Sequence, residues 1–108
     1  PIGYSTSLTD AFVGAGAAGG TNKFNGDLSE IYVNHAASLD LSTEANRRKF
    51  ISATLKPVDL GATGATPTGT APIIFFSGAT VNWHTNKGTG GGFTEVGALT
   101  DATTRPSD

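Results

Sequence analysis

The apolar residues of this chain occur in short runs with the spacing of β-strands. Residues 27–33 (DLSEIYV) follow an Asn-Gly turn signal, and their apolar side chains fall on both faces of a strand. Residues 73–76 (IIFF) are apolar at successive positions, which predicts a strand that is covered on both faces. We therefore expect interior or interface strands in these two segments.

Three further runs are shorter. Residues 10–15, 81–84 and 93–96 combine apolar or aromatic residues with turn-forming neighbours, and each run predicts a short strand. One sheet of this size cannot cover two strands that are apolar on both faces. We therefore expect that the chain is not a self-sufficient monomer, and that the missing layer comes from a preceding part of the polypeptide or from neighbouring subunits.

Only one stretch has helical features. Ser42 or Thr43 can cap a helix, and Glu44 suits its first turn. Three basic residues at 47–49 lie toward the C-terminal half, where the helix dipole favours them. The pattern predicts one short helix near residues 42–53. We interpret the basic side chains as a solvated helix face, with binding of an anionic partner as the alternative.

Two segments rich in glycine or proline predict loops. Residues 61–72 have no hydrophobic periodicity, and Pro67 and Pro72 fix φ and withhold N–H donors. We expect this segment to run extended over a surface, outside any sheet and without contributing to a core. Residues 86–92 (NKGTGGG) separate two of the predicted strands, and we interpret them as a hairpin loop.

The composition excludes several classes of protein. The chain has 108 residues, so it forms one domain at most, and its 15 glycines and abundant threonine favour strands and long loops. Seven Lys and Arg against nine Asp and Glu give a net charge of −2, which disfavours nucleic-acid binding. The absence of cysteine excludes disulfides and thiolate metal sites. No apolar run approaches the roughly 20 residues that cross a bilayer, so we expect no membrane insertion.

No arrangement of residues indicates catalysis. The two histidines, His35 and His84, are far apart and have no metal-ligand spacing, so we interpret each as a surface or hydrogen-bonded side chain. The sequence has no nucleophile elbow of the Gly-x-Ser-x-Gly type. The glycines at 88–92 lack the third glycine and the following helix of a dinucleotide-binding fingerprint. We predict no catalytic residues, no cofactor and no metal.

Several motifs resemble known phage domains. Residues 24–33 resemble the closing strands of a concanavalin A-like, laminin-G-type jelly roll, in which a Phe-x-Gly-x-hydrophobic-x-Glu strand follows a glycine-bearing strand like residues 12–15. Five further segments resemble a C-terminal extension found on such domains in tailed-phage and prophage proteins: residues 39–42, 46–50, 56–61, 67–72 and 86–91. The resemblance covers residues 12–107.

The resemblance implies an all-β fold, a partial concanavalin A-like jelly-roll sandwich with one short helix near 42–53 and long Gly/Thr-rich loops. Residues 1–60 would form its closing strands and the helix. Residues 61–108 would form an extended loop and a C-terminal β extension of the same structural unit. A full sandwich has about twice as many strands as this chain provides.

Two activities of similar domains are not expected here. Some members hydrolyse glucans through carboxylates at period-two spacing on one strand, whereas Asp27 and Glu30 are three residues apart and project from opposite faces of a regular strand. Lectin-like relatives bind Ca²⁺ on loops rich in Asp and Asn. No such cluster is present here, so we interpret Asp27, Asp59 and Asp101 as turn and cap residues.

The resemblance implies a non-enzymatic structural protein of the virion, in capsid decoration, a tail or a fibre. Its expected partners are other virion proteins and further copies of itself. The alternative is a lectin-like module that binds a host glycan. Its candidate contacts, which could equally serve an interface, are Trp83, Tyr32, Asn82 and Asn86; Tyr4 and Asp27 are additional candidates for the sugar.

Overall fold

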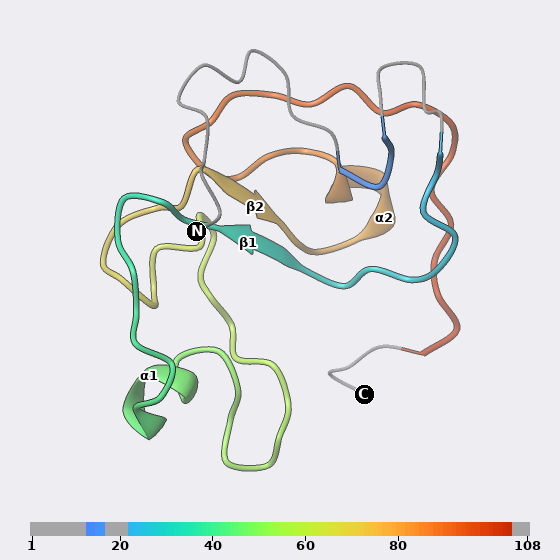
Figure 1. Ribbon diagram of the computed structural model, residues 1–108. Helices are drawn as coiled ribbons and strands as arrows, with labels where there is room; N and C mark the ends of the chain where they lie inside the picture. Colours follow the sequence, from blue (N-terminus) through green and yellow to red (C-terminus); the bar gives the residue numbers. More distant parts are fainter. Residues whose placement is uncertain (1–12, 17–21, 105–108) are drawn as a thin grey trace.

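The computed structural model describes residues 13–16 and 22–104. In this part of the chain the elements are β1 (Ile31–Val33), α1 (Glu44–Arg47), β2 (Ile74–Phe76) and α2 (Thr80–Trp83). The two strands lie side by side at the centre, α2 lies close to β2, and α1 lies apart from the strands at the lower left (Figure 1). Turns and extended segments form the rest of the described chain.

β1 and β2 form an antiparallel pair in which Tyr32 lies opposite Phe75. Phe75 and Phe76 are 1% and 2% exposed, although their side chains point to opposite faces of the strand. The prediction that residues 73–76 form a strand covered on both faces is therefore confirmed for Ile74–Phe76.

A glycine-rich segment, residues 86–90, occupies the other edge of β2. The N–H of Lys87 donates to the carbonyl oxygen of Phe75, and the N–H of Gly90 donates to that of Ile73, both at 2.9 Å. β2 is therefore hydrogen-bonded along both edges. The interpretation of residues 86–92 as a hairpin loop is wrong, because the segment pairs with β2 and no strand flanks it on either side.

Several predicted strands are absent or shorter. Residues 80–83 are helical, because the chain turns back after β2 and one helical turn brings Trp83 against Phe76. Residues 93–96 have no regular secondary structure, and of the predicted strand at 27–33 only Ile31–Val33 forms. Of the run at 10–15, only residues 13–15 are described; they form bends, and the rest lies outside the described residues.

The predicted helix near 42–53 is confirmed only as the single turn of α1, because residues 50–58 form a hairpin instead. The N–H of Ser52 donates to the carbonyl oxygen of Lys56, and the N–H of Val58 donates to that of Phe50. These two hydrogen bonds join the two arms of the hairpin. The chain therefore reverses direction at the residues where the sequence predicts that the helix continues.

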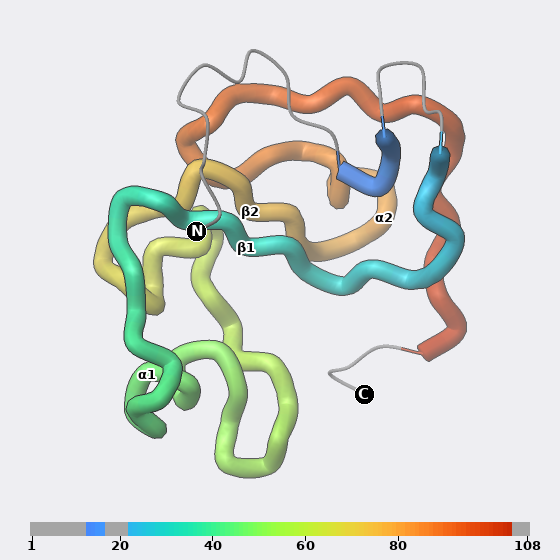
Figure 2. Tube along the Cα trace, viewed as in Figure 1, coloured from blue at the N-terminus to red at the C-terminus, as the bar shows by residue number. Residues whose placement is uncertain are grey.

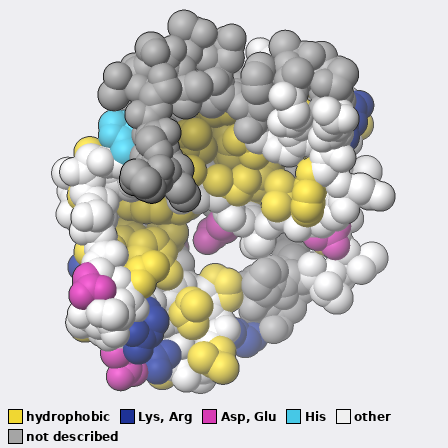
Figure 3. Space-filling model, viewed as in Figure 1, with side chains coloured by type: hydrophobic (Ala, Val, Ile, Leu, Met, Phe, Trp, Pro, Cys, Tyr) yellow, Lys and Arg dark blue, Asp and Glu magenta, His cyan; other side chains and the backbone are white. Residues whose placement is uncertain are grey.

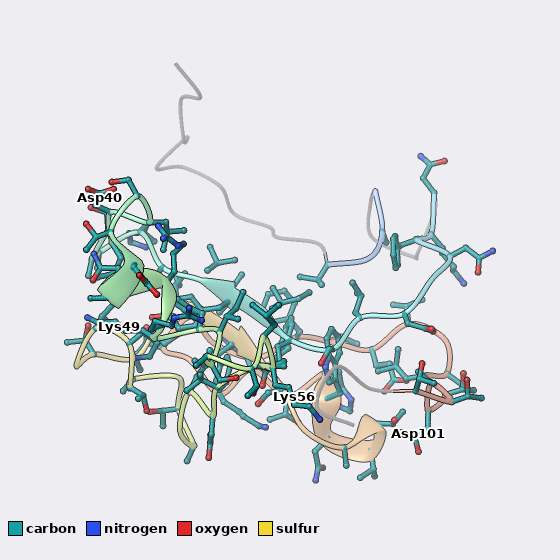
Figure 4. The ribbon with its side chains drawn as sticks, turned by 90° about the horizontal axis from the view of Figure 1, so that it is seen from below. Asp40, Lys49, Lys56 and Asp101 are labelled. Carbon is teal, nitrogen blue, oxygen red and sulfur yellow. The ribbon has the colours of Figure 1, made fainter. Side chains whose placement is uncertain are left out.

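Asp40 organises the chain before α1. Thr43 is the N-cap residue, which confirms one of the two predicted positions, but its side chain makes no capping hydrogen bond. The N–H of Ser42 donates instead to Asp40 Oδ1 at 2.9 Å. Hydrogen bonds from the hydroxyl and the N–H of Ser42 lower the pKa of Asp40. Asp40 and Lys49 lie beside α1 in Figure 4.

The basic residues 47–49 do more than form a solvated face. Arg47 and Arg48 are exposed as expected, but Arg47 Nη1 donates to the carbonyl oxygen of Leu41 at 2.8 Å, which secures the chain entering α1. Lys49 is half-buried, and its Nζ donates to the carbonyl oxygen of Pro67 at 2.9 Å. Lys49 therefore ties α1 to the loop at 61–72.

That loop lies outside the sheet, as predicted, but it is neither extended nor remote from the core. It folds as successive turns and buries Gly64, Pro67 and Pro72. A Cβ atom on Gly64 would lie 2.9 Å from the ring of Phe75, so the missing side chain lets the loop pack against this aromatic ring. The loop therefore covers one face of β2.

The hairpin at 50–58 has a strained tip. Leu55 has φ 62°, a conformation that costs a β-carbon-bearing residue about 1–2 kcal/mol, and its side chain is 80% exposed. We expect Leu55→Gly to raise the free energy of unfolding by about 0.5–1 kcal/mol, because glycine relieves the strain and little packing is lost. Thermal or urea unfolding measures the change.

Asn22 provides the matched control for this substitution. It also has positive φ, at 52°, but asparagine tolerates the left-handed conformation better than leucine does. Asn22→Gly should therefore change stability little. A loss of stability in Leu55→Gly would show that the leucine side chain stabilises the folded monomer.

Candidate functional site

Trp83 lies in an aromatic cluster on one face of the sheet. Its ring centroid is 5.3 Å from that of Phe76, and the ring of Phe93 meets Phe76 edge to face at 5.0 Å. The indole N–H of Trp83 donates to the carbonyl oxygen of Ser29 at 2.7 Å. Trp83 therefore fastens α2 to the segment that leads into β1.

Tyr32 lies in a second aromatic cluster, on the other face. Its ring packs edge to face against Phe50, at a centroid distance of 5.5 Å, and against Phe75 at 6.2 Å. Phe75 and Phe76 are adjacent in β2 and point to opposite faces. The structure therefore does not bring Tyr32 and Trp83 together into one site.

Asn86 uses its whole side-chain amide for backbone hydrogen bonds. Oδ1 accepts the N–H groups of Phe75 at 2.9 Å and Gly88 at 3.0 Å. Nδ2 donates to the carbonyl oxygens of Ile73 at 3.0 Å and Gly91 at 2.8 Å. An asparagine amide makes at most about four such bonds, so Asn86 has no capacity left for a ligand hydroxyl.

Two of the remaining glycan candidates, Asn82 and Asp27, are exposed. Asn82 is exposed on α2, next to Trp83 in sequence. Asp27 is exposed in the extended segment before β1, and Tyr4 lies outside the described residues. Of the candidate contacts within the described part of the chain, only Trp83 and Asn82 therefore share an element.

Glu30 has an electrostatic environment that the sequence does not reveal. Both Asp27 and Glu30 precede β1, so the expectation that they project from opposite faces of a regular strand does not apply. Partial burial raises the pKa of Glu30, the negative charge of Asp59 raises it further, and the positive charge of Lys87 lowers it. Asp59, interpreted from the sequence as a turn residue, is thus a charged neighbour of Glu30.

This environment predicts a pH-dependent effect of Glu30→Gln. A carboxyl group whose pKa is raised by folding contributes stability at low pH that is lost as the pH rises through the folded-state pKa. We expect the substitution to stabilise the chain at pH 7 by a fraction of a kcal/mol, because these charges are largely exposed. Urea unfolding at pH 7 and pH 3 measures it; an equal gain at pH 3, or a loss at pH 7, would contradict this explanation.

The two histidines have different surroundings. His35 is exposed, as expected, whereas His84 is half-buried and its Nδ1 lies 3.0 Å from Glu95 Oε2 without the geometry of a hydrogen bond. Glu95 also accepts the N–H of Leu99. At the start of α2, the Thr80 hydroxyl donates to Asp101, which lies beside α2 in Figure 4.

Other kinds of site have no support among residues 13–16 and 22–104. No group of three or more His, Cys, Asp or Glu side chains in these ranges is placed to hold a metal ion. Neither α1 nor α2 is long and apolar enough to cross a membrane, and the described residues form no other α-helix.

One surface groove, which we call the β1 groove, has a volume of about 500 Å³. It is lined mainly by apolar residues and glycines that lead into β1, among them Val13, Ala15, Phe24, Leu28 and Ile31. Another groove has about 180 Å³ and is lined in part by Tyr32, Leu41 and Phe50. Neither includes Glu30 or Asp59.

Exposed apolar side chains are the most prominent surface feature. Among the described residues the buried hydrophobic side chains of the core are Leu60, Phe75 and Phe76. Nine large apolar side chains are 43–80% exposed, namely Phe24, Leu28, Val33, Leu41, Ile51, Leu55, Val81, Val96 and Leu99. In Figure 3 apolar surface spreads across the centre of the molecule.

No protein-family model, curated protein or solved structure matches the chain.

Proposed function

We propose that this chain is a non-enzymatic structural component of a phage virion, in capsid decoration, a tail or a fibre. It acts through contacts with other virion proteins and with copies of itself. The observation that carries the proposal is an imbalance within residues 13–16 and 22–104, where a very small buried core stands against nine exposed large apolar side chains. The phage setting rests on the motifs that resemble the C-terminal extension of tailed-phage proteins.

The magnitude of the hydrophobic effect supports a role in assembly. Covering about 400 Å² of apolar surface contributes roughly 10 kcal/mol at about 25 cal/mol per Å². That is comparable with the whole stability of a small domain. A partner that covers these side chains would therefore stabilise the fold and the assembly together.

Glycan binding is the alternative, and the arrangement of side chains favours it less. The hydrogen bonds of Asn86 are all made within the chain, and Tyr32 and Trp83 lie on opposite faces. A sugar site would have to be built on Trp83 and Asn82. We therefore expect no saturable signal on a glycan array; a signal that is lost in the folded variant Asn82→Ala would favour the lectin function.

The virion location has a direct test. Particles purified from the phage or prophage host that encodes the chain should contain it in a fixed ratio to the other structural proteins, measured by quantitative mass spectrometry of tryptic peptides. Recovery of the chain only in the particle-free fraction would overturn the proposal. The same sample serves as its own control, because the known capsid proteins must be detected in it.

A further inference from the structure

The pair Asn25-Gly26 lies in the segment that leads into β1. Both residues are exposed; Asn25 has no regular secondary structure and Gly26 forms a bend. In Figure 2 this segment runs along the right side of the molecule before it enters β1. The backbone nitrogen of a glycine can attack the carboxamide carbon of a preceding asparagine, because glycine has no Cβ atom to hinder the approach. The rate in the folded chain depends on how firmly the two residues are held.

Within the described part of the chain, no hydrogen bond holds residues 25–28. The nearest anchor on one side is the N–H of Phe24, which donates to a backbone carbonyl oxygen at 2.8 Å. The nearest anchor on the other side is the carbonyl oxygen of Ser29, which accepts an indole N–H at 2.7 Å. Backbone that lacks such bonds changes conformation at low cost. The carboxamide and the glycine nitrogen can therefore meet without breaking a hydrogen bond between described residues.

The ring of Phe24 lies over Gly26 but does not fix it. A Cβ atom on Gly26 would lie 2.8 Å from the end of this ring, so the missing side chain makes room for the ring. Phe24 is itself 55% exposed, and the end of its ring can move aside into solvent. The contact therefore leaves the backbone of Gly26 free to rearrange.

The other asparagines are less reactive, because each is followed by a residue that carries a side chain. Three of them are also held by hydrogen bonds. Asn34 Oδ1 accepts the N–H of Ala36 at 3.0 Å, Asn46 Nδ2 donates to a carbonyl oxygen at 2.9 Å, and the amide of Asn86 makes four bonds. The chain has five such asparagines, namely Asn22, Asn34, Asn46, Asn82 and Asn86.

We propose that Asn25 is a deamidation site, which converts spontaneously to isoaspartate and aspartate in the folded chain at neutral pH. The inference goes beyond the proposed function and does not depend on it. It needs no enzyme and no cofactor, because the nucleophile is the backbone nitrogen of Gly26 and the only other reactant is water.

The reaction has two steps. In the first, a bond forms between Gly26 N and Asn25 Cγ, and the bond between Cγ and Nδ2 breaks. The side-chain nitrogen leaves as ammonia with the proton from Gly26 N, and a five-membered cyclic imide remains. In the second, water opens the imide. Opening at Cγ gives aspartate, and opening at the main-chain carbonyl carbon gives isoaspartate, in which the backbone runs through Cγ. One water is consumed, one ammonia is released, and nothing is oxidised or reduced.

The conversion changes the border of the β1 groove. It replaces a neutral amide by a carboxylate two residues from Asp27, so the net charge of the chain changes from −2 to −3. Isoaspartate also lengthens the backbone by one methylene group. The changed residue lies between Phe24 and Leu28, which both line the groove. An aged chain therefore differs from a new one in the charge and the backbone of this surface.

The first test follows the reaction at three asparagines of one peptide. The folded chain is kept at pH 7 and 37 °C, and the tryptic peptide 24–47, which contains Asn25, Asn34 and Asn46, is analysed by tandem mass spectrometry. Asn25 should convert roughly tenfold or more faster than the other two. Hydrogen-exchange protection at the Lys87 N–H verifies that the sample is folded. Equal rates at the three positions, or no conversion at Asn25, would overturn the proposal.

The second test measures the contribution of the fold. The same chain is incubated in urea at the same pH. Because residues 25–28 are not held by hydrogen bonds within the described structure, Asn25 should convert at similar rates in the folded and the denatured chain. A rate that is more than about tenfold lower in the folded chain would show that the fold protects Asn25, and would overturn the proposal.

Three variants assign the reaction to this pair. Ion exchange separates the acidic product from the starting chain, and Asn25→Gln should remove its principal acidic product. Gly26→Ala should slow the formation of that product roughly tenfold or more, because the added methyl group hinders the attack. Asn82→Gln is the matched control: Asn82 is exposed but is followed by tryptophan, so its replacement should leave the rate unchanged. An unchanged rate in Gly26→Ala would contradict attack by the Gly26 nitrogen.

Discussion

Asn86→Ala should destabilise the chain by about 3–4 kcal/mol. The substitution removes four hydrogen bonds and leaves the N–H of the buried residue Phe75 without a partner. An unsatisfied buried N–H costs about 1–3 kcal/mol, and each further lost bond adds about 1 kcal/mol or less. A domain of this size has a small total free energy of unfolding. A large part of the Asn86→Ala protein should therefore already be unfolded at 25 °C without urea, so that urea produces only a small further unfolding signal.

Asn82→Ala is the control for this prediction. Asn82 is four residues earlier and exposed, so its replacement should change the free energy of unfolding by less than about 0.5 kcal/mol. Asn86→Asp should fall between the two, since it keeps the two accepted bonds and loses the two donated ones. Equal stability of Asn86→Ala and Asn82→Ala would contradict the role given to Asn86.

Gly88→Ala should cost about 2–3 kcal/mol by separating the glycine-rich segment from β2. A Cβ atom at this position would collide with the carbonyl oxygen of Pro72 and lie 2.9 Å from that of Ile73. Both are backbone atoms that cannot rotate away, so the segment itself has to move. Hydrogen exchange should then show loss of protection at the N–H groups of Lys87 and Gly90, which bond β2.

Gly92→Ala is the matched control, because a Cβ atom there would have no other atom within 4 Å and the backbone does not have positive φ. Its stability should equal that of the wild type or exceed it slightly. If both alanine variants retain protection at Lys87, close approach of the segment to β2 is not needed for the fold.

The sequence predicts β2 well because four successive apolar residues of high β propensity can be buried only where both faces are covered. It fails for α2, since four residues cannot distinguish a strand from one helical turn. The conformation there follows from contacts that are distant in sequence, above all the Trp83 indole N–H on the carbonyl oxygen of Ser29, 54 residues away. The hydrophobic pattern of residues 81–84 alone contains no information on a contact so distant in sequence.

In the candidate site, too, the sequence predicts the residue types but not which residues lie together. Trp83 and Tyr32 are recognisable from sequence as large aromatic anchors, and both pack in aromatic clusters. That they occupy opposite faces follows from the period-two geometry of β2 only once the strand pairing is known. The sequence suggests Asn86 as a glycan or interface contact. The signal for its backbone hydrogen bonds is its position two residues before Gly88, whose N–H donates to Asn86 Oδ1.

We propose that protein contacts cover the apolar surface of this chain, and we therefore expect that the isolated chain is not a self-sufficient monomer. Static light scattering of the purified 108-residue chain over a hundredfold range of concentration, combined with thermal unfolding, tests it directly. We expect a mass above 10.9 kDa that rises with concentration, and an unfolding temperature that rises with it. A monodisperse 10.9 kDa monomer with a cooperative, concentration-independent transition would contradict the claim.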